Sequence, residues 1–185
     1  MRIIAGEYRG RRIQVASRPG LRPTPDRVRE TLFNWLGQDL TGWRCLDAFA
    51  GSGALGFVAA SRGAAEVVLL ERDRHVAASL AESARRLGAT ALRVECAEAI
   101  AWMARSAPGA FDLVFIDPPF DSDLALPALA GAGRLVRPSG SVYVEGPGAL
   151  SDRDAEAHGL GITHRSRAGA VHFHLLRPLK QDIAG

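Results

Sequence analysis

Residues 46–56 read L-D-A-F-A-G-S-G-A-L-G, and this stretch guides the interpretation of the whole sequence. It follows an apolar run and places Gly51, Gly53 and Gly56 in the G-x-G-x-x-G spacing, which lets a backbone turn approach a ligand at the carboxyl end of a strand. Glu71 ends the next apolar run, where a carboxylate can accept hydrogen bonds from ribose hydroxyls. We therefore predict a nucleotide-cofactor site. Glycines that serve only a tight turn are the alternative.

The sequence on both sides of this loop alternates between short apolar runs and helical patterns. The apolar runs cover residues 43–49, 66–71, 91–95, 111–117 and 140–145, and the helical patterns lie near residues 54–62, 75–87, 97–106 and 123–135. This order is typical of an α/β fold, in which helices cover both faces of an open, mostly parallel sheet. The tail, with I-T-H-R-S-R and then A-V-H-F-H-L-L-R, predicts a C-terminal antiparallel hairpin that completes the sheet.

Nucleotide-cofactor folds of this kind hold either a dinucleotide or S-adenosylmethionine, and charge distinguishes the two. Asp47, Glu71 and Asp117 stand at the ends of three predicted strands, so their carboxylates should meet at one edge of the sheet. They would repel the pyrophosphate of a dinucleotide, whereas S-adenosylmethionine carries a sulfonium, an ammonium and one carboxylate, and so has a net positive charge. We predict S-adenosylmethionine. A nicotinamide-dependent dehydrogenase is the alternative, because dinucleotide enzymes also keep an acid at the position of Glu71.

The fourth apolar run ends in D-P-P-F, residues 117–120. The Asp117 carboxylate and the Pro118 carbonyl could accept hydrogen bonds from the exocyclic amine of a base and turn its lone pair toward a methyl donor. Pro118 and Pro119 would hold the loop stiff, and Phe120 would offer a flat surface to an unstacked base. This predicts methyl transfer to a base amine. In the alternative, the prolines only end the strand and Phe120 packs inside.

The first 35 residues are strongly basic. They hold eight arginines against three acids, a net charge of +5, while the whole chain has a net charge of +3. We predict a β-hairpin arm and linker in residues 1–24, then a domain over residues 25–185 that begins with a helix at residues 25–36, with Thr24 as N-cap and Pro25 at its first position. A basic arm on a near-neutral body indicates nucleic-acid binding, and a solvated segment without a partner is the alternative.

The composition, with 47% hydrophobic and 23% charged residues among 185, is that of a globular protein with one core. No run approaches the about 18 to 20 apolar residues of a membrane span, and the first residues are too charged for a signal peptide, so we predict a cytoplasmic protein. Cys45 and Cys96 lie in apolar stretches without a C-x-x-C pair, which predicts buried thiols in a reducing compartment. His172 and His174 share one face of the last predicted strand, and we predict packing there and no metal.

Two pairs of motifs resemble known proteins. L-D-A-F-A-G-S-G-A-L-G with D-P-P-F is similar to the class I amino-methyltransferases, and R-I-I-A-G-x-x-R-G-R with L-R-P-T-P-D-R-V-R-E-T-L-F-N-W-L closely resembles the bacterial RsmD family, over roughly residues 2–120. The resemblance implies a Rossmann-like class I methyltransferase fold with a seven-stranded sheet. It also implies methylation of the N2 amine of a guanine in 16S ribosomal RNA, with that RNA or the assembling small subunit as partner. We expect a monomer.

The same resemblance implies roles for individual residues. The catalytic set would be Asp117, Pro118, Pro119 and Phe120. The cofactor would contact Thr24, Arg27, Asp47, Ala50, Gly51, Ser52, Gly53, Glu71, Arg72, Ala97 and Asp117. RNA would contact Arg2, Arg9, Arg11, Arg12, Arg22 and Arg29. Relatives often carry a polar side chain beside the alanine that corresponds to Ala97. This chain has Cys96 there and its acid at Glu98, so the resemblance does not decide which residues of this segment contact the adenine.

Two further functions remain as alternatives. D-P-P-F would also suit a DNA adenine or cytosine amino-methyltransferase, but the chain has no long extra segment for reading a DNA target. A non-catalytic RNA-binding or assembly protein would need no cofactor site, and the presence of Asp47, Glu71 and Asp117 argues against it.

Overall fold

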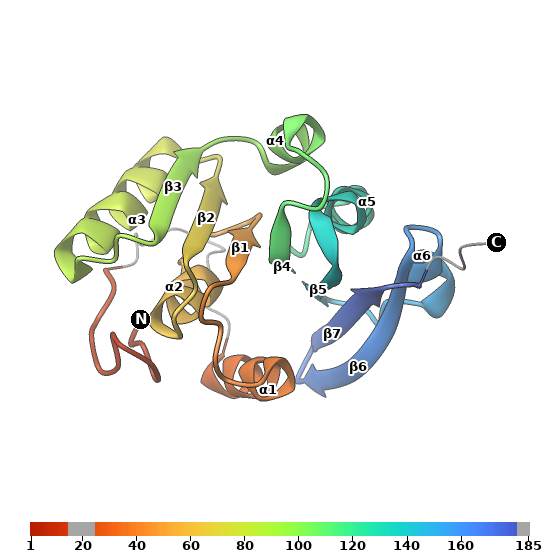
Figure 1. Ribbon diagram of the computed structural model, residues 1–185, viewed down its shortest axis with the longest axis horizontal. Helices are drawn as coiled ribbons and strands as arrows, with labels where there is room; N and C mark the ends of the chain where they lie inside the picture. The colour runs from red at the N-terminus through yellow and green to blue at the C-terminus, as the bar shows by residue number, and fades with distance from the viewer. Residues whose placement is uncertain (15–24, 181–185) are drawn as a thin grey trace.

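A seven-stranded sheet runs through the centre of the computed structural model, which describes residues 1–14 and 25–180 (Figure 1). Its strands, in the order β3-β2-β1-β4-β5-β7-β6, are β1 Arg44–Asp47, β2 Glu66–Glu71, β3 Leu92–Cys96, β4 Phe111–Ile116, β5 Val136–Gly146, β6 Leu160–Ala168 and β7 Val171–Pro178. β1 to β5 are parallel, and β7 pairs antiparallel with both β5 and β6. The predicted α/β class and the C-terminal antiparallel hairpin are therefore confirmed.

Helices cover both faces of this sheet. They are α1 Asp26–Leu36, α2 Ala54–Ser61, α3 Arg74–Leu87, α4 Ala99–Arg105, α5 Ala125–Leu135 and the short α6 Asp152–Glu156. One buried cluster joins the apolar sides of α1, α2 and α3 to one face of the sheet, and a second joins α4, α5 and α6 to the other. We call the first the α1–α3 face. The continuous apolar runs of β2 and β4 follow from this burial on both faces.

The N-terminal arm packs on the α1–α3 face. Ile3 and Ile13 are buried in the same cluster as α1 and α2, and the backbone N–H of Glu7 donates to the carbonyl of Ser61 at the end of α2. The predicted hairpin is present, although its two sides pair through a single isolated bridge between Arg2 and Arg12 rather than through full strands. The predicted linker lies outside the described residues.

Two local expectations were wrong. The N-cap of α1 is Pro25, with no side-chain cap, so the proline precedes the helix instead of forming its first residue. Thr24 lies outside the described residues. Cys45 is buried as expected, but Cys96 is exposed, because it ends the edge strand β3, which has β2 as its only neighbour in the sheet. Among the described residues, no helix combines the length and the apolar character that crossing a membrane requires.

Candidate cofactor and amine site

Acidic side chains from four adjacent strands meet on the α1–α3 face at the carboxyl ends of these strands. Leu69, Phe115 and Tyr143 belong to the buried cluster on this face, and side chains alternate between faces along a strand. Glu71, Asp117 and Glu145 each follow one of these residues by two positions, so their side chains point to the same face. Asp47 lies on this face as well, because it pairs in register with both Leu69 and Phe115. The predicted convergence of Asp47, Glu71 and Asp117 is therefore present. Glu145 is a fourth acid that the sequence analysis missed, although it also ends an apolar run.

The glycine loop forms the turn between β1 and α2. Gly51 has φ +50° and Gly53 has φ +75°, both in the left-handed region that favours glycine. A Cβ atom on Gly53 would come within 2.7 Å of the Phe57 ring and 2.8 Å of Leu80, so this position has no room for a side chain. The spacing in the sequence thus serves both a backbone conformation and close packing of α2 against α3.

Asp47 lies beneath this loop. Its side chain is buried, and its Oδ2 accepts a hydrogen bond from the backbone N–H of Gly56 at 3.0 Å. Burial raises the pKa of Asp47 to about 7, against the opposing effect of hydrogen bonds from the N–H groups of Gly56 and Phe49, and the negative charge of Glu71 adds to the rise. Asp47 therefore holds the start of α2, and it is a group whose charge changes near neutral pH.

Glu71 joins two loops at the end of β2. Its Oε2 accepts from the N–H of Gly51 at 3.1 Å, and its Oε1 accepts from the N–H of Asp73 at 2.8 Å. The backbone N–H of Ala97 donates to the Glu71 carbonyl, so the segment after β3 reaches the same place. Gly51, Glu71 and Ala97, all predicted cofactor contacts, are thus brought together at one edge of the sheet.

The D-P-P-F segment continues directly from β4. Asp117 is partly buried, Pro118 is buried, and the carbonyl of Pro119 accepts hydrogen bonds from both the N–H and the hydroxyl of Ser122, which closes the turn. Phe120 is 43% exposed, so the alternative in which its ring packs inside is wrong. The segment therefore presents a carboxylate and an exposed aromatic ring from a short, stiff loop.

A buried pair of polar side chains stands behind Asp117. The Tyr143 hydroxyl donates a hydrogen bond to Glu145 at 2.8 Å, and both side chains are buried. Burial raises the pKa of Glu145. Burial also raises the pKa of Tyr143, and the negative charges of Glu145 and Asp117 act in the same direction. Glu145 therefore adds a fourth acidic group to the site, while the Tyr143 hydroxyl stays protonated and donates to it.

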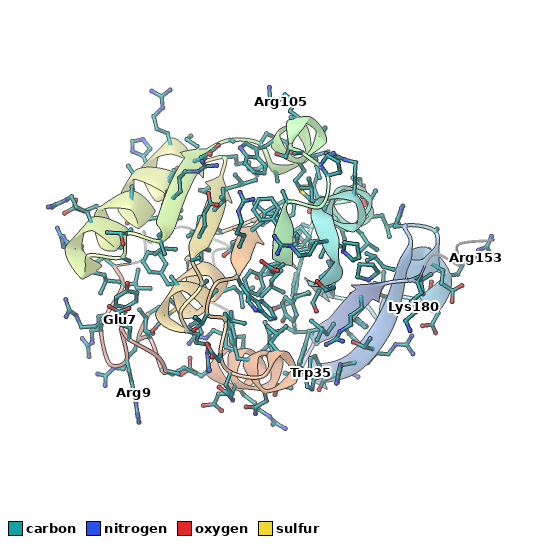
Figure 2. The ribbon with its side chains drawn as sticks, viewed as in Figure 1. Glu7, Arg9, Trp35, Arg105, Arg153 and Lys180 are labelled. Atoms are coloured by element: carbon teal, nitrogen blue, oxygen red, sulfur yellow. The ribbon has the colours of Figure 1, made fainter. Side chains whose placement is uncertain are left out.

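The remaining predicted contacts are distributed differently. Ala50 and Ser52 are buried in the glycine loop. Arg72, just after β2, and Arg27, in the first turn of α1, are exposed. Glu98 is the N-cap of α4, where it accepts from two backbone N–H groups. Among the RNA candidates, Arg2, Arg9, Arg11 and Arg12 are exposed on the arm, and Arg9 extends into solvent (Figure 2). Arg22, like Thr24, lies outside the described residues.

Arg29 does not fit the predicted role. Its side chain is only 2% exposed, and its guanidinium contacts the Asp26 carboxylate and the Met1 sulfur. A guanidinium buried in this way is not presented to phosphates. We therefore remove Arg29 from the proposed RNA contacts and assign it to the packing between α1 and the chain terminus.

These residues fit S-adenosylmethionine better than a dinucleotide. The carboxylates of Glu71 and Asp117, with the buried acids Asp47 and Glu145 beside them, give this edge of the sheet an acidic character, which suits a cofactor with a net positive charge and opposes a pyrophosphate. The turn at Gly51 exposes backbone rather than side chain, and Glu71 lies beside it as an acceptor for hydroxyls. Among the described residues, no group of three or more His, Cys, Asp or Glu side chains could hold a metal ion. His174 instead accepts a hydrogen bond from the N–H of Leu150.

The strand order, the reversed β7 and the glycine loop after β1 define this as the fold of the class I S-adenosylmethionine-dependent methyltransferases. A family model described as "Conserved hypothetical protein 95" matches residues 1–177. The chain belongs to this family, which is the RsmD family of the resemblance.

Relatives of known name and structure agree with this assignment. The Ribosomal RNA small subunit methyltransferase D of Haemophilus influenzae is 43% identical over 150 residues, which cover 78% of each chain. The protein of the same name in Escherichia coli is 49% identical over 120 residues, which span 65% of this chain and only 60% of that protein. The solved structure of Escherichia coli yhhF superimposes with a TM-score of 0.83 at 33% identity and covers 98% of this chain and 99% of the other.

Proposed function

We propose that this protein transfers a methyl group from S-adenosylmethionine to the exocyclic N2 amine of a guanine in 16S ribosomal RNA, and that it does so in the cytoplasm. Family membership and the names of the relatives support the class of reaction and the RNA. The observation that carries the proposal is the placement of Asp117 and the exposed Phe120 on a stiff turn at the acidic edge of the sheet.

When bound, the cofactor supplies an electrophilic methyl group on a positively charged sulfur. The work of the protein is then to position the acceptor amine. The Asp117 carboxylate and the Pro118 carbonyl accept hydrogen bonds from the two amine hydrogens, which directs the nitrogen lone pair away from the ring. Phe120 stacks against the base and holds it out of the RNA. Because the turn is closed by Ser122, this geometry exists before the base arrives.

The proton of the amine must leave after the methyl group is transferred. The Asp117 carboxylate, which already accepts a hydrogen bond from the amine, is the proposed proton acceptor, and Asp117 acts electrostatically on the buried Tyr143–Glu145 pair. The negative charge of the Asp117 carboxylate favours the cationic state of an amine that has just been methylated. The same charge opposes phosphates, so the RNA backbone must be held elsewhere, by the exposed arginines of the arm.

The test is methylation of 16S ribosomal RNA and of the small subunit with labelled S-adenosylmethionine, followed by mass mapping of the modified base. Asp117→Asn should lower the transfer rate by about 100-fold or more, while S-adenosylhomocysteine still binds. Asp123→Asn, which removes an exposed acid further along the same loop, is the matched control and should behave as the wild type. No label on any guanine of 16S ribosomal RNA in either substrate, or unchanged turnover of Asp117→Asn, would overturn the proposal.

A further inference from the structure

A basic hollow lies between the N-terminal arm and the last turns of α3. Its volume is about 410 Å³, and its lining includes Arg11, Arg12, Gln14, Ser83 and Arg86. The charged side chains of this lining are the three guanidiniums of Arg11, Arg12 and Arg86, and all are positive. The acids of the candidate site are not part of it. This hollow therefore has the opposite charge to the amine site.

The hollow is a built feature of the fold rather than a chance gap between loose side chains. The carbonyl of Gln14 accepts from the hydroxyls of Ser83 at 3.2 Å and Ser79 at 3.4 Å, which fastens the arm to α3. The Gln14 side-chain oxygen accepts from the Arg86 guanidinium at 2.8 Å. These acceptors are neutral, so they orient Arg86 without cancelling its charge.

One acid competes for Arg86. Glu82, one turn earlier on α3, pairs with Arg86 at 2.7 Å and with Arg85 at 2.7 Å. The hydrogen bonds and charges of these two arginines lower the pKa of Glu82 to about 2, so it stays ionised. Its single charge is shared between two arginines, and Arg11 and Arg12 add two more cations. The balance at this end of α3 remains positive.

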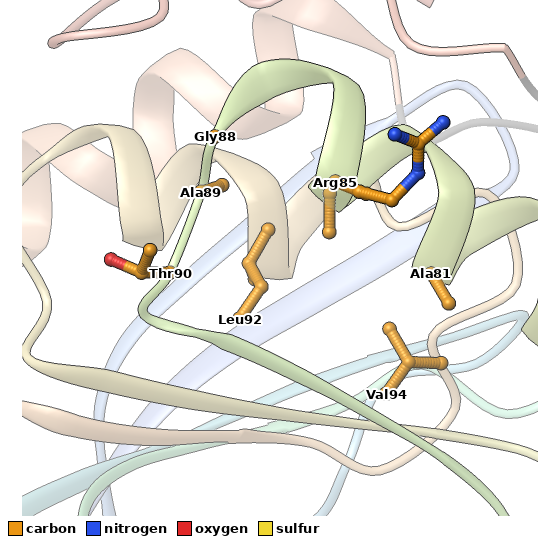
Figure 3. A pocket seen from close by; sticks show the side chains of 8 residues that line it. Ala81, Arg85, Gly88, Ala89, Thr90, Leu92 and Val94 are labelled. Carbon is orange, nitrogen blue, oxygen red and sulfur yellow. The ribbon is translucent and has the colours of Figure 1, made fainter.

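The two arginines that share Glu82 belong to different surroundings. Arg86 lines the basic hollow, whereas Arg85 stands at the rim of a second hollow of about 370 Å³ between α3 and β3 (Figure 3). That second hollow is lined largely by small and apolar side chains, including Ala81, Leu92 and Val94. Its lining offers one guanidinium, so it does not favour a phosphate in the way that the basic hollow does.

We infer that the basic hollow binds the sugar-phosphate backbone of the RNA substrate, and that the C-terminal turn of α3 is an RNA contact together with the arm. Guanidiniums arranged around a concave surface match the geometry of phosphate oxygens. The inference rests on the proposed function, because it takes RNA as the substrate. It adds Arg86, which the sequence analysis did not consider, to Arg11 and Arg12.

The position of the hollow agrees with a contact at a distance from the reacting base. α3 begins just after Glu71 and rises about 1.5 Å per residue, so Arg86 lies about 18 Å along the helix from the start of α3. The arm and α3 both belong to the α1–α3 face, on which the acids of the candidate site also lie. An RNA held in the hollow can therefore extend along α3 toward the site.

The experiment measures binding of 16S ribosomal RNA between about 50 and 300 mM salt, with no cofactor and no turnover. Arg86→Gln and Arg12→Gln should each raise the Kd by about 5-fold and reduce the slope of log Kd against log salt by about 0.7 to 0.9. Glu82→Gln should lower the Kd by about 3-fold, because it releases two arginines from their acid. A gain in affinity cannot arise from a misfolded variant.

Arg93→Gln is the matched control. The Arg93 side chain is 57% exposed and pairs with Glu95 at 2.8 Å, while that of Arg86 is 56% exposed and pairs with Glu82, so both changes remove one cation from a similar exposed pair. Equal loss of RNA affinity in Arg93→Gln and Arg86→Gln would show that only overall charge matters and would overturn the inference. A second result would also overturn the inference. If inorganic phosphate stabilises the wild type but not Arg86→Gln, and Arg86→Gln still binds RNA as tightly as the wild type, then the hollow is a site for free phosphate.

Failure of the inference and failure of the proposed function can be told apart. A wild-type protein that methylates guanine in RNA but shows no effect of Arg86→Gln and Glu82→Gln keeps its function and loses the RNA contact at the hollow. A wild-type protein that transfers no methyl group but shows the expected changes in RNA affinity loses the proposed reaction and keeps the contact.

Discussion

The carboxylate of Glu71 accepts a hydrogen bond from the backbone N–H of Gly51 at 3.1 Å, so the end of β2 is fastened to the glycine loop that follows β1. The second oxygen of the same carboxylate holds the N–H of Asp73, the N-cap of α3. One side chain thus fixes two loops at the edge where the cofactor is proposed to bind, and its removal should disturb this edge.

The first prediction concerns Glu71→Gln. An amide offers a single acceptor oxygen, so either Gly51 or Asp73 loses its partner, and a hydrogen bond to a charged group contributes about 1.5 to 3 kcal/mol. We expect S-adenosylhomocysteine to bind about 10-fold or more weakly, as measured by calorimetry. Glu66→Gln, at the opposite end of the same strand, should leave this affinity unchanged. Equal affinity of Glu71→Gln and the wild type would contradict the role given to Glu71.

The second prediction concerns Asp47 and pH. Burial raises its pKa in the folded protein to about 7, from an ordinary value of 3.8, so between these values the unfolded chain releases a proton that the folded protein retains. The contribution of Asp47 to the free energy of unfolding is therefore fully present below about pH 4. It decreases as the pH rises to about 7, by about 4 kcal/mol at most.

Asp47→Asn removes this titration. In urea unfolding from pH 4 to pH 8, the free energy of unfolding of the variant minus that of the wild type should rise with pH and level off above about pH 7. A difference that stays constant over this range would show that Asp47 keeps an ordinary pKa.

The third prediction concerns Gly53→Ala. At φ +75° an alanine is strained by about 1 to 2 kcal/mol, and its methyl group would meet Phe57 and Leu80 at under 3 Å, which costs about 1 to 3 kcal/mol more. Gly42→Ala is the matched control, because Gly42 has φ +81° with open space around it. Thermal unfolding should show a clearly larger loss of stability for Gly53→Ala. Equal losses would mean that packing at the loop contributes nothing beyond the backbone conformation.

The fourth prediction concerns Phe120→Ala. Phe120 is 43% exposed, so its loss should change the free energy of unfolding by less than about 0.5 kcal/mol. Loss of the stacking surface should lower kcat/KM for RNA by about 10-fold or more, because one stacked base contributes about 1 to 3 kcal/mol. Leu126→Ala, at 46% exposure on α5, is the control and should retain full methyl transfer. Undiminished transfer by Phe120→Ala would exclude base stacking at this ring.

The burial of Arg29 was not predicted, although its helical spacing indicates a buried position. The family resemblance implies that Arg29 contacts RNA, yet Arg29 occupies the same helical stripe as Leu32, Phe33 and Leu36, at the spacing of a buried face. Asp26, three residues earlier on α1, is a local partner, whereas the Met1 sulfur reaches the guanidinium only when the arm folds against α1. Cys96 illustrates the reverse error, since an apolar neighbourhood in sequence became an exposed edge of the sheet.

The succession of strands and helices along the chain, the glycine loop and the acids that end the strands could be predicted from the sequence, because apolar periodicity and glycine conformation are local properties of each segment. Which charges are buried and which surfaces are shared depends instead on contacts between distant segments. The burial of Tyr143 and Glu145, the raised pKa of Asp47 and the basic hollow between the arm and α3 all depend on segments far apart in the chain. Desolvation and charge pairing arise from three-dimensional neighbours, and no spacing along one segment specifies them.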